Sequence, residues 1–128
     1  MRGIARAYFI SAVVYGMLGM LLGLDMAMRH DRGQLPTHAH IMVIGWVSFA
    51  IFGLFYFVLG EAVPGWLAQT HFWLAQVSLA LLVAGLWAYY AGYTQLEPLA
   101  AIGSMGYAVS FLVFAVAALR AAWTPRAA

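Results

Sequence analysis

The sequence contains no cysteine and no lysine, and only 8% of its 128 residues are charged. The absence of cysteine excludes disulfides, thiolate metal sites, iron–sulfur clusters and cysteine nucleophiles. Soluble domains carry about 25% charged residues, whereas this chain is 66% hydrophobic, with a mean hydropathy of +0.90. Six arginines against four acidic residues give too little positive charge for a nucleic-acid footprint. The composition therefore predicts an integral membrane protein in contact with a lipid bilayer.

Four apolar segments are each long enough to cross a bilayer, which takes about 20 helical residues. The connections between them are too short to hold a domain outside the membrane. We therefore predict an all-α membrane protein of four up-and-down transmembrane helices, forming one domain over residues 1–128. The predicted spans are residues 7–28, 38–60, 66–92 and 98–119.

The arginines are divided unequally between the two sides of the predicted helix bundle. Only Arg29 and Arg32 lie on the side of the first and third connections. The side shared by the two termini carries the other four, Arg2, Arg6, Arg120 and Arg126. Because positive charge is retained on the cytoplasmic side, this bias predicts a multi-pass protein with both termini in the cytoplasm.

Two histidines, His38 and His40, stand one residue apart at the beginning of the second span. Successive helical residues are about 100° apart, so these two rings point to nearly opposite faces of the helix. One interpretation is a pair of interfacial histidines that bond lipid headgroups or the first connection. The other is a pair of ligands for a metal or heme iron, because imidazole is the commonest metal ligand among side chains. The divergence of the rings disfavours one metal ion held by both.

A further histidine, His71, begins the third span at the other side of the membrane. About 14 residues of depth separate it from His40, which is roughly 20 Å along the helix axis at 1.5 Å per residue. One iron cannot bridge that distance within a chain. We therefore expect His71 to bond Gln69, Gln76 or a neighbouring backbone group instead.

Methionines near the histidine pair indicate a second kind of metal site. Thioether and imidazole groups are soft enough to bind cuprous ion, although methionine is also ordinary packing material in apolar helices. A copper-binding or copper-handling protein is therefore an alternative function. Its candidate ligands share a similar depth and are Met26, Met28, His30, His38 and Met42. No combination of residues typical of a catalytic site is found, so no catalytic residue is predicted.

The segment from Thr37 to Tyr56 (THAHIMVIGWVSFAIFGLFY) resembles the main subunit of heme–copper oxidases and nitric oxide reductases. Residues 70–74 (THFWL) are similar to a second stretch of that subunit. The chain looks most like small four-helix bacterial relatives of it. The main subunit has three arcs of four helices, and one helix carries a His-x-His pair whose rings serve two hemes. The resemblance implies that this chain corresponds to one arc and that three copies rebuild the ring.

The resemblance also implies a cofactor and its ligands. In a homotrimer, His38 of one chain and His40 of the next would hold one heme b between them near the outer membrane face. Arg29 or Arg32 would contact the heme propionates, and Asp25 would form an ion pair with one of these arginines. The implied protein is a cytochrome b of the bacterial inner membrane with an electron-transfer or other redox role. Its electron partner would be quinol or a redox protein.

The chain also departs from the oxidase pattern. It lacks the adjacent histidine pair that the oxidase copper site needs, and an iron with two protein ligands has no free position for oxygen. Reduction of oxygen or nitric oxide is therefore not supported, and whether the protein is an enzyme is left open. A structural or assembly subunit without a cofactor is a third interpretation.

Overall fold

The computed structural model describes residues 1–123 and consists of helices, with no strand in that part of the chain. Helix α1 spans Gly3–Arg29, and the second span begins with α2, Leu35–His40. It continues without a break through a π-helix, η1 (Ile41–Ser48), into α3 (Phe49–Leu59) and the 3₁₀ turn η2 (Gly60–Ala62). The remaining elements are α4 (Gly65–Tyr90), the 3₁₀ turn η3 (Thr94–Leu96) and α5 (Glu97–Trp123).

Four of these helical stretches are long and apolar enough to span a membrane, and they contain 26 to 30 residues each. The predicted four-helix membrane fold is therefore confirmed. Proline occurs only near the beginnings of helices within the described residues. Pro36 is in the first turn of α2, Pro64 caps α4 and Pro98 is the second residue of α5. At these positions proline replaces an N–H group that has no partner in the helix, so it leaves the apolar interior of each span unbroken.

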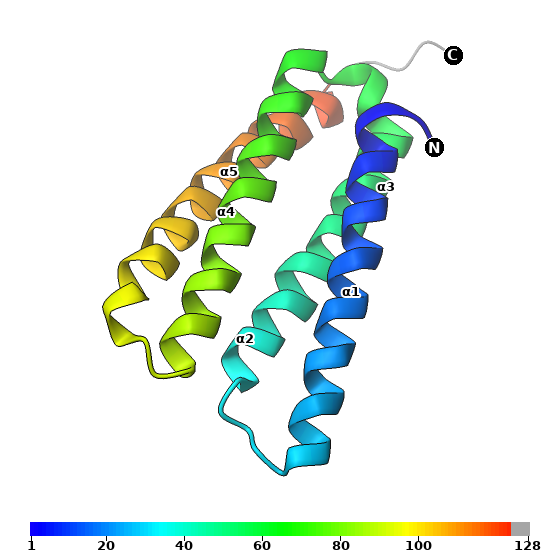
Figure 1. Cartoon of the computed structure of the whole chain (residues 1–128). Coiled ribbons are helices and arrows are strands. Elements are labelled where there is room, and N and C mark those ends of the chain that lie inside the picture. Colours follow the sequence, from blue (N-terminus) through cyan, green and yellow to red (C-terminus); the bar gives the residue numbers. More distant parts are fainter. Residues whose placement is uncertain (124–128) are drawn as a thin grey trace.

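Consecutive spans run in opposite directions and form two hairpins (Figure 1). The first joins α1 to the α2–α3 span, and the second joins α4 to α5. The N-terminus lies at the same end as the α3–α4 connection and the end of α5, which we call the terminal end. The α1–α2 and α4–α5 connections lie at the other end, which we call the distal end.

The second hairpin is held by very close helix contact. A Cβ added at Gly103 would lie 2.8 Å from the Ser78 carbonyl oxygen and would also collide with the Leu82 backbone. Gly85 meets the backbone of Ala100 in the same way. Small residues that let two backbones touch are the usual basis of helix association in membranes, where water does not drive apolar side chains together.

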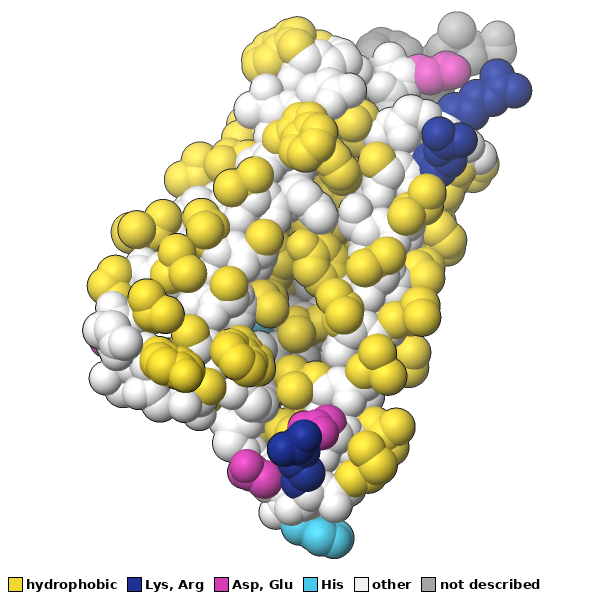
Figure 2. Space-filling model, viewed as in Figure 1, with side chains coloured by type: hydrophobic (Ala, Val, Ile, Leu, Met, Phe, Trp, Pro, Cys, Tyr) yellow, Lys and Arg dark blue, Asp and Glu magenta, His cyan; other side chains and the backbone are white. Residues whose placement is uncertain are grey.

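The outer surface is apolar between two charged ends. Figure 2 shows charged side chains at the terminal and distal ends of the face in view, with hydrophobic side chains between them. Only 17% to 39% of the most apolar stretch of each span is buried within the chain. The rest of this surface faces lipid or other protein chains, so the molecule is a multi-pass membrane protein.

Candidate functional site

His38 is fixed by a hydrogen bond to the neighbouring helix. Its Nδ1 lies 2.8 Å from the carbonyl oxygen of Gly19 in α1, and its ring is half-buried. A carbonyl oxygen only accepts, so Nδ1 must carry the ring proton and donate it. In the neutral ring this leaves a free lone pair on Nε2. A hydrogen bond of this kind is what commonly orients a metal-ligating histidine and sets its tautomer.

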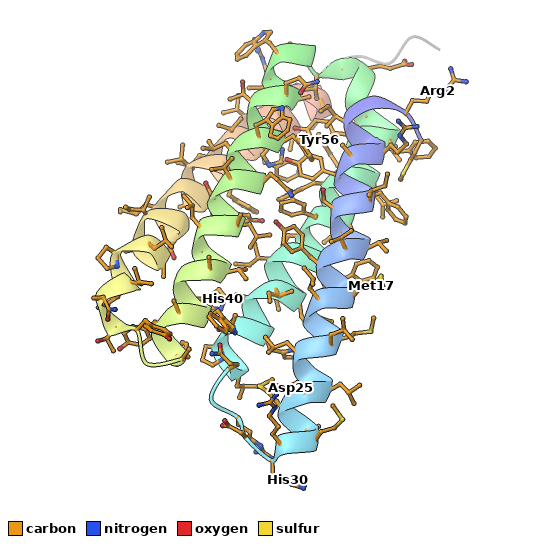
Figure 3. All side chains as sticks on the ribbon, viewed as in Figure 1. Arg2, Met17, Asp25, His30, His40 and Tyr56 are labelled. Atoms are coloured by element: carbon orange, nitrogen blue, oxygen red, sulfur yellow. The ribbon has the colours of Figure 1, made fainter. Side chains whose placement is uncertain are left out.

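His40 makes the same kind of bond within its own helix. Its Nδ1 donates to the carbonyl oxygen of Pro36 over 2.7 Å, so its Nε2 also keeps a free lone pair. The ring is half-buried and lines a shallow cavity of about 250 Å³ with Ala39, Val43 and Ile44. Figure 3 shows His40 on the side of α2 that faces α4, whereas His38 bonds α1. The two rings therefore offer their Nε2 atoms to different surroundings.

A larger cavity of about 610 Å³ opens beside His38 at the distal end. Its size is within the usual 300–1,000 Å³ range for small-molecule sites. Gly23 makes room for the ring, because a Cβ at this position would lie 2.8 Å from Cε1 of His38. The wall is formed by the end of α1, the first connection and the beginning of α2, and the lining residues are Gly23, Met26, Ala27, His30, Arg32, Leu35 and His38.

Three of the five candidate copper ligands meet in this cavity, namely Met26, His30 and His38. Met28 is outside its wall with a side chain that is 68% exposed. Met42 packs against Gly19, where an added Cβ would contact its sulfur. Within residues 1–123, no three His, Cys, Asp or Glu side chains are grouped to hold a metal ion.

The two arginines of the first connection differ in their surroundings. Arg29 donates from Nε to Asp25 over 2.7 Å, which confirms the expected ion pair one turn apart on α1. Both side chains are largely exposed, so the pair adds about 0.3–0.5 kcal/mol to helix stability. Arg32 lies in the wall of the 610 Å³ cavity with His38, whereas Arg29 does not. Of the two, Arg32 is therefore better placed to meet an anionic group in that cavity.

His71 is at the terminal half of the bundle and is fully buried. The expectation that it bonds Gln69, Gln76 or the backbone is wrong. Its Nδ1 lies 2.8 Å from the Tyr8 hydroxyl of α1 and 3.0 Å from the Tyr56 hydroxyl of α3. Residue spacing within one helix did not point to these tyrosines, because it cannot show which residues of other helices lie at the same depth. A phenol within an apolar span was the available signal, since a buried Tyr hydroxyl usually finds a partner.

Directly after His40 the backbone widens into the π-helix η1, residues Ile41–Ser48. Here the Ser48 hydroxyl donates to the Val43 carbonyl, five residues earlier, over 2.9 Å. π-Helical turns are rare and are frequently found at functional sites. The histidine pair therefore stands at a boundary between two helix geometries.

Known proteins give one informative match. Over 89 residues the chain is 35% identical to "Cytochrome c oxidase polypeptide 1" of Halobacterium salinarum. The match covers 66% of this chain but only 15% of that protein. Neither a protein-family model nor a solved structure matches the chain. These findings place a four-helix membrane protein in a distant, heme–copper oxidase-like relationship, and a membrane redox role fits that relationship in broad terms.

Proposed function

We propose that the protein is a membrane cytochrome b in which His38 of one chain and His40 of the next bind one heme iron. The supporting observation is the pair of Nδ1–carbonyl hydrogen bonds, to Gly19 and to Pro36. Each bond orients a ring and leaves its Nε2 lone pair available. A bis-imidazole heme exchanges one electron and binds no oxygen while both ligands stay in place.

The positions of the two rings support sharing between chains. His38 bonds α1 within its own hairpin, while His40 lines a separate, shallow cavity on another side of the helix. Each of the two rings needs a second axial ligand from another chain. When copies of the chain close into a ring, the His38 side of every chain can meet the His40 side of its neighbour, because every copy presents the same two surfaces. We propose a homotrimer, on the resemblance to an oxidase subunit of three four-helix arcs.

The cavity beside His38 suits a heme edge in its chemistry. Half of its lining side chains are apolar, namely Met26, Ala27 and Leu35, and Arg32 supplies a positive charge for a propionate. We propose that the distal end faces the outside of a bacterial inner membrane, on the arginine bias of the sequence. Arg126 contributes to that bias but lies outside the described residues. The electron partner would be a quinol or a redox protein that approaches this end.

The absorption spectrum of the purified protein tests the proposal. We expect a Soret band, with sharp α and β bands on reduction, as for low-spin heme. His38→Ala and His40→Ala should each remove these bands, because each removes an axial ligand from every site. His71→Ala serves as the control and should retain them, since His71 bonds Tyr8 and Tyr56 at the other half of the bundle. Loss of the heme in His71→Ala alone would contradict the ligand assignment.

The same preparation tests the second candidate function. Met26, His30 and His38 line one cavity, which is the observation that favours copper. A colourless protein that retains copper through purification, and loses it in Met26→Leu and His30→Ala, would replace the heme proposal. A protein with neither chromophore nor metal would support a structural or assembly subunit.

Gly23 tests whether the position of the His38 ring matters. In Gly23→Val the new Cβ would lie 2.8 Å from Cε1 of His38 and should displace the ring from the Gly19 carbonyl. Misorienting a ligating histidine costs roughly 10- to 100-fold in affinity, so heme titration should show a loss of that size. The control is Leu24→Val, which places the same side chain on the exposed face of the same turn. Equal heme affinity in both variants would argue against His38 as a ligand.

A further inference from the structure

His71 has more hydrogen-bonding capacity than its neighbours satisfy. Its Nδ1 is shared by two phenol hydroxyls, and its Nε2 is buried without a hydrogen-bond partner in the described structure. If Nδ1 accepts from a tyrosine, the Nε2 hydrogen has no acceptor. If Nδ1 donates instead, the hydroxyl hydrogens of Tyr8 and Tyr56 have no acceptor within residues 1–123. Neither neutral tautomer satisfies the three groups by themselves.

Such a deficit is costly at this place. The side chains of His71 and Tyr8 are 0% exposed, and an unsatisfied polar group in an apolar interior costs several kcal/mol. Buried polar atoms left without a protein partner commonly bind ordered water. A water molecule both donates and accepts, so it completes the hydrogen bonding of either tautomer.

Three buried side-chain oxygen atoms in α4 and α5 also lack a hydrogen-bond partner within residues 1–123, and they belong to Gln76, Tyr107 and Ser110. Ser110 is 0% exposed, and its Oγ has no hydrogen-bond partner in the described part of the chain; the same is true of the buried Oε1 of Gln76. Ser110 lies one turn before Phe114 on the same face of α5, and the Phe114 ring centre is 5.3 Å from that of His71. Gln76 lies five residues after His71 in α4, which places the two residues about 140° apart around the helix axis, so only Ser110 is assigned to the surroundings of His71.

The membrane–water interface at the terminal end is close to His71. His71 is six residues from the first residue of α4, or about 9 Å along the axis. A cavity of about 470 Å³ lies between, and its wall includes Tyr56 and Ala68 together with the exposed polar residues Arg2, Glu61 and Gln69. Tyr56 thus lines the cavity on one side and bonds His71 on the other. One side chain therefore separates this cavity from His71.

We propose that His71 anchors an internal water site within the membrane-spanning bundle. In this site, water joins the imidazole Nε2 to the hydroxyl of Ser110. The ligand is water itself, held by neutral groups in a cage that is otherwise aromatic. This site is independent of heme at the distal end, so failure of either proposal leaves the other standing.

A single cysteine provides the test, because the wild-type chain has none and the S–H infrared band of a variant is therefore unique. Ser110→Cys keeps the shape of the side chain and retains a weak hydrogen-bond donor in place of the hydroxyl. We expect its S–H group to exchange to S–D in D₂O at least tenfold faster than that of Ala12→Cys. Ala12 is the matched control, since it is also 0% exposed. It lies one turn after Tyr8 in α1, and Ser110 lies one turn before Phe114 in the oppositely directed α5, so both are one turn further from the terminal end. Exchange no faster than in Ala12→Cys would overturn the proposal.

The wild-type protein gives a measurement that does not depend on a substitution. With ¹⁵N-labelled histidine in lipid nanodiscs, we expect a cross-peak between water and Nε2 of His71, assigned by its loss in His71→Gln. The competing arrangement is an Nε2–H group directed at the Phe52 ring, whose centre is 4.7 Å away in a T-shaped contact. An upfield-shifted Nε2 proton without a water cross-peak would support that arrangement and overturn the water site.

Discussion

Co-expression of the His38→Ala and His40→Ala chains is expected to restore heme that neither variant binds alone. If each site takes His38 from one chain and His40 from the next, a His40→Ala chain followed by a His38→Ala chain forms one intact site. Every mixed cyclic trimer contains one such junction out of three. Random mixing of equal amounts should therefore recover about one quarter of the wild-type heme per chain, measured by the reduced α band.

The co-expression result separates assembly models that a spectrum alone does not. If one chain supplies both ligands of its own heme, neither variant completes a site and mixing restores nothing. The control is the double variant His38→Ala/His40→Ala mixed with either single variant, which should stay colourless. Light scattering in detergent should give the mass of a trimer for the heme-loaded wild type. A monomer with bound bis-histidine heme would contradict shared ligation.

Gly103→Val is expected to destabilise the α4–α5 hairpin strongly. A Cβ at Gly103 meets the Leu82 backbone and the Ser78 carbonyl, and backbone atoms cannot rotate away as a side chain can. Overpacking of this kind costs typically 1–3 kcal/mol and occasionally more. We expect a loss of about 3 kcal/mol, measured by unfolding in mixed micelles.

Ala101→Val is the matched control, because it adds the same side chain to an exposed position of α5. It should change stability by less than about 0.5 kcal/mol, as surface substitutions generally do. Equal destabilisation by both would mean that the cost arises from a branched side chain in the helix and not from the contact with α4.

The fold could be predicted from the sequence because one physical requirement dominates it. Every backbone group inside a bilayer must be bonded within the protein, so long apolar segments become helices. The ends of the segments were less accurately predicted. The first span begins at Gly3 instead of residue 7, and the second at Leu35 instead of residue 38. Polar residues extend helices beyond the apolar region that hydropathy detects.

The environment of each histidine was only partly predictable. Helical periodicity placed His38 and His40 on different sides of one helix, because that relation is local. It could not show that Gly19 supplies the acceptor for His38, since that contact depends on how two helices pack. The failure at His71 has the same origin. Its partners Tyr8 and Tyr56 lie 63 and 15 residues away in sequence, and only the bundle brings them to one depth.

The π-helix between His40 and Phe49 has a consequence for how the sequence tolerates change in length. The α3 face beyond it packs Phe49, Phe52 and Tyr56 into the core, so its rotation is set by that packing. A π-helical turn holds about one residue more than an α-helical turn. Removing one residue from Ile41–Ser48 would therefore allow an ordinary α-helix there and leave both histidines in nearly the same direction relative to that face, whereas an ordinary α-helix with all eight residues would turn them by about 100°. The wide turn thus takes up one residue without turning the histidine pair relative to the aromatic core.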